Sequence, residues 1–378
     1  MPSFSNFKNI DKYEKKLEFK INDVDLSVVN SIRRIILAEI PCIAFYFDAY
    51  DKDDNSILIK KNTGVLHNEF LAHRISLIPL YFNEDEINTF DPKKYKFVLH
   101  EKNNDDETKI VTTKNFKIFQ QNDKDITKSI ELPDSFREHV FPKCPITEDH
   151  ILITKLRPNL YDNKLGEEID IECVASVGIA KQHARWCAVS QCSYYNSIDV
   201  TLVDKAIKEQ SNGLSNEEKT KLEKKFETIE KYRYFKKNKY DEPNEFEFTI
   251  QTECRLTPKQ IFGKAINILN DNVNNFMERC PTLNIINTPN FIQVEIKNEN
   301  HTLLNVLQSM IYNINLKNNP DTVLDYIGYF QNHALEETMT LKLKFKQDVD
   351  VVEFLQNSCK DIITYIKTLK EEWISASA

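Results

Sequence analysis

The sequence predicts an α+β protein built from two related copies of one pattern, and two self-matches of the chain support this prediction. In the first self-match the stretch 17–21 falls opposite 292–296, and in both stretches apolar and polar residues alternate. This period of two is typical of a half-buried strand. The second self-match aligns another alternating stretch, 246–251, with 339–344. The order strand, helix, strands, strand, helix therefore occurs twice, although the pattern alone leaves open whether this reflects duplication or the general similarity of amphipathic α/β segments.

An amphipathic helix is expected after the first strand of each copy. The stretches "DLSVVNSIRRII" (25–36) and "NHTLLNVLQSMI" (300–311) both place apolar residues at positions i, i+1, i+4, i+7 and i+8, so each apolar stripe lies on one helix face. Ser27 and Thr302 occupy matching positions and are the expected N-caps. A copy of about 80 residues has a thin core, and its one-sided helices need a partner face. We therefore expect the two helices to meet along a seam formed by Val29, Ile32, Ile36, Leu304, Leu307 and Ile311.

The two copies differ in continuity. The C-terminal copy is compact, whereas the N-terminal copy begins near Leu17 and ends only near Arg279, so a further domain must interrupt it. The connecting stretch "CPTLNIINTPN" has two prolines, several asparagines and no regular period, which indicates a linker. The expected organisation is a first dimerisation domain at 12–50 plus 168–280, a mainly β insertion domain at 51–167, a linker at 281–290 and a second dimerisation domain at 291–374.

Composition argues against several classes of function. The chain has 378 residues, a net charge of -8 and a pI near 5.6, which argues against tight direct binding of nucleic acid through clustered cations. Its eight cysteines contain no C-x-x-C pair and suggest no disulfide framework, so a reducing compartment fits best. The longest apolar stretch, Ile35 to Phe47, is interrupted by Glu39 and Pro41, and the N-terminal stretch lacks an apolar leader region. We expect a protein that is neither secreted nor inserted in a membrane.

Five stretches carry a resemblance to a known family. The stretches "LSVVNSIRRIILAEIP" (26–41), "LHNEFLAHRISLIPL" (66–80) and "VASVGIAKQHARW" (174–186) resemble the third-largest subunit of eukaryotic RNA polymerase II, a relative of bacterial alpha. The stretches "FIQVEIKNENHTLLNVLQSMI" (291–311) and "SCKDIITYIKTLKEEW" (358–373) resemble its eleventh subunit. In that family the two subunits are separate chains that pair as a heterodimer. Here both lie in one chain, as in the polymerases of some large cytoplasmic DNA viruses.

The resemblance implies an assembly platform for a multisubunit DNA-dependent RNA polymerase. Such a subunit takes no part in nucleotide addition and nucleates binding of the second-largest and then the largest subunit, together with small zinc-binding subunits. Its two alpha-type dimerisation domains would pair within the chain. Its place would be intracellular, in a cytoplasmic viral factory and the virion if the source is viral and in the nucleus if it is cellular. The residues that the resemblance implies for subunit docking are Arg33, Arg34, Glu69, His73, Arg74, Lys181, His183, Arg185 and Trp186.

The insertion departs from the family pattern at its metal site. Many relatives carry a cysteine-rich zinc loop or an iron–sulfur site there, but residues 51–167 contain only Cys144. A combination of Cys144 with His139 and His150 matches no standard ligand spacing. We therefore expect neither a metal nor a cofactor, and no catalytic residue.

Two other functions stay open on the sequence alone. A dimeric scaffold unrelated to transcription would share the paired helices, and a small metalloenzyme could use His183, Cys187 and Cys192. The charged run 215–237 begins with a capping box, Ser215 with Glu218, and predicts either a solvated surface helix or a docking helix.

Overall fold

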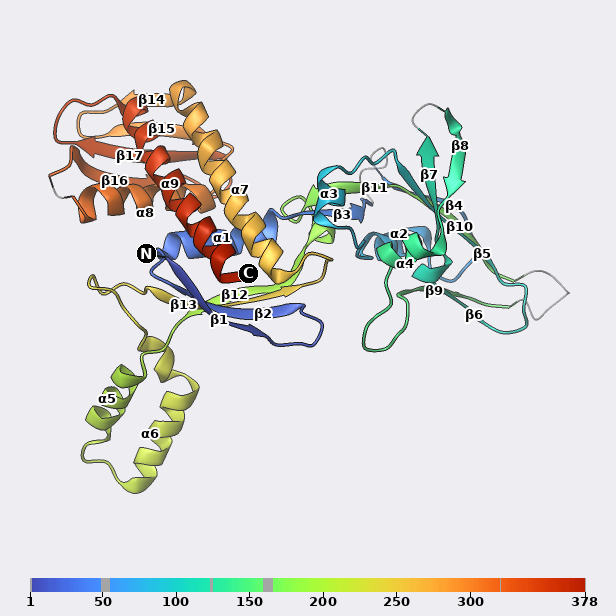
Figure 1. Ribbon diagram of the computed structural model, residues 1–378, viewed down its shortest axis with the longest axis horizontal. Helices are drawn as coiled ribbons and strands as arrows, with labels where there is room; N and C mark the ends of the chain where they lie inside the picture. The colour runs from blue at the N-terminus through green and yellow to red at the C-terminus, as the bar shows by residue number, and fades with distance from the viewer. Residues whose placement is uncertain (1, 49–54, 123–124, 159–165, 320, 378) are drawn as a thin grey trace. The chain divides into compact units, whose positions relative to one another are not determined.

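The computed structural model describes residues 2–48, 55–122, 125–158, 166–319 and 321–377, which belong to two compact units (Figure 1). Unit 1 comprises Met1–Ile36, Gln191–Gln251 and Pro258–Ala378, and unit 2 comprises Leu37–Ser190 and Thr252–Thr257. Helices and strands are mixed throughout, which confirms the predicted α+β class.

Unit 1 contains one antiparallel sheet from each copy. The N-terminal copy has the strand order β1 (Ser3–Asn9), β2 (Lys16–Asn22), β13 (Glu245–Thr252) and β12 (Val189–Asn196). The C-terminal copy has the order β14 (Asn284–Asn287), β15 (Ile292–Lys297), β17 (Thr338–Phe345) and β16 (Leu324–Phe330). All four strands that the self-matches predict are present as β2, β13, β15 and β17.

The central strands of the two sheets pair in the same register. Phe19 of β2 lies opposite Phe248 of β13, and Val294 of β15 lies opposite Leu341 of β17. The first self-match aligns Phe19 with Val294, and the second aligns Phe248 with Leu341. Two self-matches that come from separate parts of the sequence therefore describe one repeated strand pair.

Four helices of unit 1 follow these strands: α1 (Leu26–Ala38), α7 (Pro258–Arg279), α8 (His301–Tyr312) and α9 (Val351–Ser377). Each buries an apolar stripe, as predicted for α1 and α8, and in Figure 1 the gold α7 and red α9 run side by side. Burial of such a stripe, rather than helix propensity, supplies most of the stability of a helix in a folded protein.

The predicted N-caps are wrong by two positions in both copies. The side chain of Asp25 accepts a hydrogen bond from the Ser27 amide at 2.8 Å, and that of Asn300 accepts one from the Thr302 amide at 2.8 Å. The caps are therefore Asp25 and Asn300, which the first self-match also places opposite each other. Asp and Asn cap at least as well as Ser and Thr, and their side chains reach the free amides of the first turn.

The connecting segment and the charged run both contain regular structure. Strand β14 falls inside the segment 281–290 and pairs with β15, so this segment is not the irregular linker that we expected. Helix α6 (Asn216–Thr228) begins at the predicted capping box of Ser215 and Glu218, and it packs against α5 (Val200–Ser211). Shorter turns are 3-10 helices η3 (Glu230–Arg233) and η4 (Cys280–Thr282) and the π-helix η5 (Asn313–Lys317).

Unit 2 is mainly β. Its largest sheet has the order β4 (Ile57–Asn62), β10 (Glu168–Cys173), β5 (Tyr95–Lys102), β7 (Lys117–Asn122) and β8 (Asp125–Glu131). Two strand pairs, β3 (Pro41–Phe45) with β11 (Ala175–Ile179) and β6 (Lys109–Thr112) with β9 (Leu152–Leu156), complete the β structure. The helices are α2 (Asn68–Ser76), α3 (Glu84–Asn88) and α4 (Asp134–Val140), with short turns η1 (Thr113–Asn115) and η2 (Ala184–Trp186).

The contacts of unit 2 extend beyond the predicted insertion at 51–167. The unit starts at Leu37 because β3 pairs with β11, and it extends past residue 167 toward Ser190 because β10 lies between β4 and β5 and η2 packs against β3 and β11. These pairings join segments that are distant in the sequence, so no local pattern marks them.

Candidate docking surfaces and helix seam

Polar side chains join α1 to both ends of α8. In the middle of α1, the Ser31 hydroxyl donates to the Thr302 carbonyl at 2.9 Å, and Arg34 Nε donates to Thr302 Oγ1 at 2.8 Å. At the start of α1, Asp25 accepts hydrogen bonds from Ser309 Oγ at 3.0 Å and Asn313 Nδ2 at 2.8 Å. The start of α8 therefore meets the middle of α1 and the end of α8 meets the start of α1, so the two helices are antiparallel neighbours.

The six apolar residues predicted for the seam are all buried. Each has at most 1% of its surface exposed: Val29, Ile32, Ile36, Leu304, Leu307 and Ile311. An ionised group placed at any of these positions would lose its hydration without gaining a partner. Their role in pairing the two copies remains a prediction, which the polar contacts between α1 and α8 support.

Aromatic residues join the far end of α9 to the N-terminal copy. The Trp373 ring lies 5.0 Å from both Phe4 of β1 and Phe19 of β2, measured between ring centroids. Gly263 of α7 lies against this indole, and a Cβ at that position would be in ordinary van der Waals contact, 3.4 Å from Trp373 Nε1. Helix α9 thus belongs to one copy by sequence and contributes a large side chain to the core of the other.

In unit 2, the three docking candidates on α2 differ in their surroundings. Glu69 and His73 are exposed. Arg74 donates from Nε to the Ile153 carbonyl at 3.1 Å and from Nη2 to the Leu152 carbonyl at 3.0 Å. Arg74 therefore fixes α2 to β9 but stays exposed, so all three candidates on α2 are accessible to a partner.

Two exposed apolar residues of α2 and its C-cap were missed by the sequence reasoning. Phe70 is 60% exposed and Leu77 is 50% exposed, and both lie off the stripe through which α2 is buried. A contiguous exposed apolar patch, unlike a single exposed apolar side chain, marks an interaction site. The signal was present in the sequence, since Phe70 falls outside the helical period of Leu71 and Ile75.

Trp186 is a core residue of unit 2 and does not present an anchor at the surface. It is 6% exposed, it stacks on Tyr46 with ring centroids 5.7 Å apart, and its Nε1 donates to the Ser176 carbonyl at 3.2 Å. The ring lies directly over Gly178, where an added Cβ would come within 2.5 Å of Trp186 Cδ2. Gly178 is therefore required for this close approach.

The cations beside Trp186 are largely engaged within unit 2. Arg185 donates to the Phe47 carbonyl at 2.5 Å and, through Nε, to His183 Nδ1 at 3.0 Å, and its guanidinium lies 4.7 Å from the Tyr46 ring centroid. Partial burial lowers the pKa of His183, and the Arg185 cation lowers it further. His183 is thus neutral near pH 7, and Lys181 is the exposed cation of this loop.

The two arginines of α1 make contacts within unit 1. Arg33 Nε donates to Asn30 Oδ1 at 3.1 Å, and Arg34 bonds across the seam to Thr302. Arg34 therefore has a second role that the sequence did not predict, because it helps to align α1 with α8.

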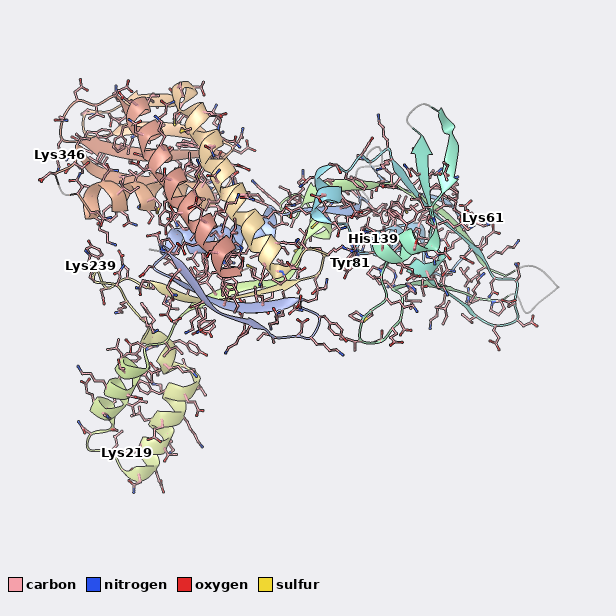
Figure 2. All side chains as sticks on the ribbon, in the orientation of Figure 1. Lys61, Tyr81, His139, Lys219, Lys239 and Lys346 are labelled. Atoms are coloured by element: carbon pink, nitrogen blue, oxygen red, sulfur yellow. The ribbon has the colours of Figure 1, made fainter. Side chains whose placement is uncertain are left out.

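The residues considered for metal binding do not form a site within the part of the chain that the structure describes. There, no group of three His, Cys, Asp or Glu side chains lies close enough to hold an ion. Both ring nitrogens of His139, labelled in Figure 2, have partners: Nε2 lies 3.2 Å from Glu86 Oε2, and Nδ1 lies 2.9 Å from Arg255 Nη1. Burial raises the pKa of the Cys192 thiol to about 12, so it is protonated near pH 7. Metal coordination requires the thiolate.

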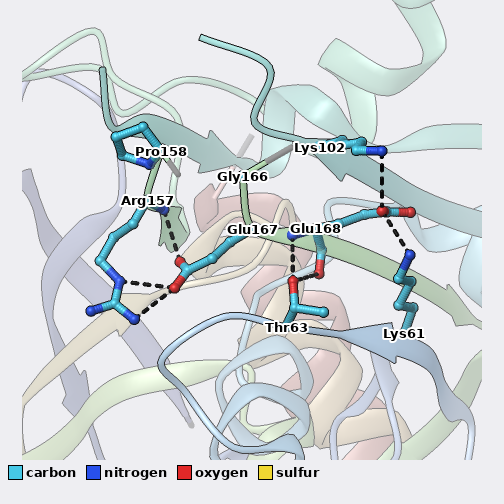
Figure 3. Close-up of a pocket in the computed structure, with 8 residues that line it drawn as sticks. All are labelled: Lys61, Thr63, Lys102, Arg157, Pro158, Gly166, Glu167 and Glu168. Atoms are coloured by element: carbon cyan, nitrogen blue, oxygen red, sulfur yellow. Dashed lines mark hydrogen bonds and ion pairs between the residues drawn. The ribbon is translucent and has the colours of Figure 1, made fainter. Parts of the chain in front are cut away.

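One pocket of unit 2, of about 540 Å³, lies at the ends of β4, β5 and β10 (Figure 3). Its carboxylates are already paired: Glu168 lies 2.8 Å from Lys61 Nζ, and Glu167 lies 2.7 Å from Arg157 Nη2. A pocket whose anions are neutralised in this way offers no distinct charge for recognising a small ligand, and we assign it no function.

Two protein-family models match this chain and identify its family. Residues 18–273 match a family described as the RNA polymerase Rpb3/Rpb11 dimerisation domain, and residues 292–372 match a second model with the same description. The chain belongs to this family. It is a structural subunit of the polymerase type and not an enzyme in its own right, as predicted.

Curated relatives agree with the Rpb3/Rpb11 assignment. The chain is 26% identical to the DNA-directed RNA polymerases I and III subunit RPAC1 of Saccharomyces cerevisiae, over 74% of this chain and 93% of that protein. It is 29% identical to human RPAC1, over 53% of this chain and 57% of that protein. It is 26% identical to subunit Rpo3 of Methanosphaera stadtmanae, over 71% of this chain and 96% of that protein. The chain thus spans nearly all of the yeast and archaeal relatives and little more than half of the human one. Among its described helices, none is long and apolar enough to cross a membrane.

Proposed function

We propose that this chain is the assembly platform of a multisubunit DNA-directed RNA polymerase. In this role it binds the second-largest subunit, then the largest, together with small zinc-binding subunits, and it takes no direct part in nucleotide addition. One observation carries the proposal: two Rpb3/Rpb11 dimerisation domains lie in one chain, and hydrogen bonds join α1 of the first to both ends of α8 of the second.

We assign the docking of a large subunit to the exposed side of α2 and the neighbouring loop of unit 2. This surface combines Glu69, His73 and Lys181 with the apolar side chains of Phe70 and Leu77. An electrostatic interaction with His73 contributes to the lowered pKa of His183, so the two side chains are close, which supports the view that α2 and the loop form one surface. An apolar centre with a charged rim is the usual composition of a protein–protein interface.

The test is co-expression of the chain with the two large polymerase subunits of its source, followed by affinity purification. Phe70→Asp should weaken recovery of the second-largest subunit, because loss of an interface hot spot costs about 2 kcal/mol or more, which is roughly 30-fold in Kd. Ile110→Asp is the matched control, since Ile110 is 58% exposed on β6 of the same unit. Failure of the unaltered chain to recover either large subunit would reject the polymerase role. Equal recovery with Phe70→Asp would reject only the assigned surface.

The source and location follow from the same proposal. A single chain that carries both dimerisation domains resembles the polymerases of large cytoplasmic DNA viruses, so we propose a gene fusion and, for a viral source, transcription in the cytoplasmic viral factory. For a cellular source the location would be the nucleus. Mass spectrometry of the natively purified complex tests the proposed role and source. A dimeric scaffold unrelated to transcription would bring no polymerase subunits with it.

A further inference from the structure

Two buried cysteines from different copies lie against each other in unit 1. Cys280 is the first residue of η4, directly after α7, and Cys359 lies in the middle of α9. They are 1% and 0% exposed. The Cys359 thiol donates a hydrogen bond to the Cys280 sulfur, and Cys280 in turn donates to the Phe276 carbonyl at 3.4 Å. The two sulfurs are therefore neighbours, and the packing of α9 against η4 holds them in place.

The surroundings of this pair differ from those of other cysteines in the chain. The thiols of Cys187 and Cys254 donate to backbone carbonyls, those of Val189 and Leu256. Cys173 is fully buried on β10, and burial raises the pKa of its thiol. In the pair, by contrast, the partner of the Cys359 thiol is a sulfur. A disulfide needs two cysteines whose Cβ atoms are about 4 Å apart and point toward each other.

We propose that Cys280 and Cys359 are a disulfide-forming site that links the N-terminal copy covalently to the C-terminal copy when a peroxide oxidises one of the thiols. The sequence reasoning found no disulfide framework, because the two cysteines are far apart in the sequence and carry no spacing signal. The inference is independent of the polymerase role, since it rests only on the packing of α7, η4 and α9.

The chemistry assigns a different part to each cysteine. The hydrogen bond from Cys359 lowers the pKa of Cys280, whereas the pKa of Cys359 is raised by that bond and by burial. Cys280 is therefore the thiol of the pair that loses its proton more readily. Once deprotonated, its sulfur bonds to one peroxide oxygen, the O–O bond breaks, and a sulfenic acid and hydroxide form. The sulfur of Cys359 then displaces the sulfenic oxygen as hydroxide and gives up its proton. In total, two thiols lose two electrons and two protons, and hydrogen peroxide is reduced to two molecules of water.

The sequence provides a direct readout for this bond. Trypsin cleaves after Arg279, Lys297, Lys346 and Lys360, so Cys280 lies in peptide 280–297 and Cys359 in peptide 347–360. Each peptide contains one cysteine. The intact folded chain would be treated with hydrogen peroxide, its remaining thiols blocked with N-ethylmaleimide, and the product unfolded, digested and analysed by mass spectrometry without reduction.

We expect the two peptides to be recovered as one linked species that dithiothreitol separates. In the folded chain Cys280 should be linked to Cys359 alone, whereas in chain oxidised after unfolding in urea it should be linked to several other cysteines. Cys280→Ser should abolish the linked species, and Cys173→Ser, a matched change at another buried cysteine, should retain it. The proposal is overturned if the exposed Cys144 is oxidised while peptide 280–297 stays free, or if folded and unfolded chains give the same set of linked peptides.

Discussion

The ring of Trp373 lies 4.3 Å from the ring of Phe262, measured between centroids, although the two residues are far apart in the sequence and belong to different copies. Phe4 and Phe19 lie around the same indole. The last turns of α9 therefore complete the core above the N-terminal sheet. The N-terminal copy therefore lacks part of its core without the C-terminal copy.

Trp373→Ala should destabilise the protein strongly. The indole is 3% exposed, and truncation of a buried Trp to Ala typically costs about 3–5 kcal/mol because it leaves a cavity. Urea unfolding of unit 1 measures this change. Ile374→Ala is the control on the same helix, because Ile374 is 56% exposed and its truncation should cost little. Equal effects of the two changes would show that α9 does not complete this core.

Cleavage of the chain between the two copies should leave them associated. A protease site placed between Pro289 and Asn290 falls in the turn after β14, where both residues are exposed. After cleavage, β14 stays with the N-terminal fragment while it remains paired with β15 of the other. The fragments should elute together in gel filtration under reducing conditions. Two separate, folded fragments would mean that the copies are independent domains.

Ile32→Asp should unfold unit 1 or prevent its formation. Ile32 is 1% exposed on α1, and an unpaired carboxylate there would be buried without compensation. Leu26→Asp on the same helix is the matched change, since Leu26 is 41% exposed and its carboxylate would stay hydrated. Circular dichroism and urea titration distinguish the two outcomes, and a stably folded Ile32→Asp protein would contradict the buried seam.

Gly178 and Trp186 should be energetically coupled. Gly178→Ala pushes a Cβ against the indole, and such overpacking typically costs about 1–3 kcal/mol. Trp186→Ala removes a buried ring and should cost about 3–5 kcal/mol. In the double variant the clash is gone, so its cost should fall below the sum of the single costs by roughly 0.5–3 kcal/mol. Additive costs in a double-mutant cycle of unfolding free energies would mean that the ring does not lie on Gly178.

His183 should make unit 2 less stable in acid. Its pKa is lowered in the folded chain, first by burial and then by Arg185, so the unfolded chain takes up a proton at this position at higher pH than the folded one. Stability from the neutral imidazole is therefore present above its unfolded pKa of about 6.5 and is lost as the pH falls below that value. His183→Gln should reduce the drop in the urea midpoint between about pH 7.5 and about pH 5.5. An unchanged drop would show that His183 does not titrate differently in the two states.

The periodic parts of this fold could be predicted from the sequence, and the non-local parts could not. The apolar alternation at 17–21 and 339–344 reports directly on which face of a strand is buried. The N-caps were misplaced because serine and threonine at the start of an apolar stripe look like caps, whereas the capping oxygens belong to Asp25 and Asn300.

The prediction of the docking residues was limited in the same way, because it depended on contacts between segments that are distant in the sequence. The sequence could indicate that Arg185 and Trp186 matter, but it could not show that Phe47 and Tyr46 of a distant segment already bind them. The extent of unit 2 depends on β10, whose place between β4 and β5 is set by pairing across long loops. Such pairing leaves no local period in the sequence.

The pairing of β2 with β13 also dictates an order of events during synthesis. Strand β2 ends at Asn22 and β13 begins at Glu245, so the ribosome must add the whole intervening stretch before β2 can meet its inner neighbour. At about 5–20 residues per second this takes roughly 10 to 45 s, which is long compared with the folding time of a small domain. Most of unit 2 emerges in that interval and is free to fold first. Until β13 is synthesised, the hairpin of β1 and β2 has an unpaired strand edge on the nascent chain. On polysomes, where nascent chains are close together, this edge is where two chains would pair incorrectly.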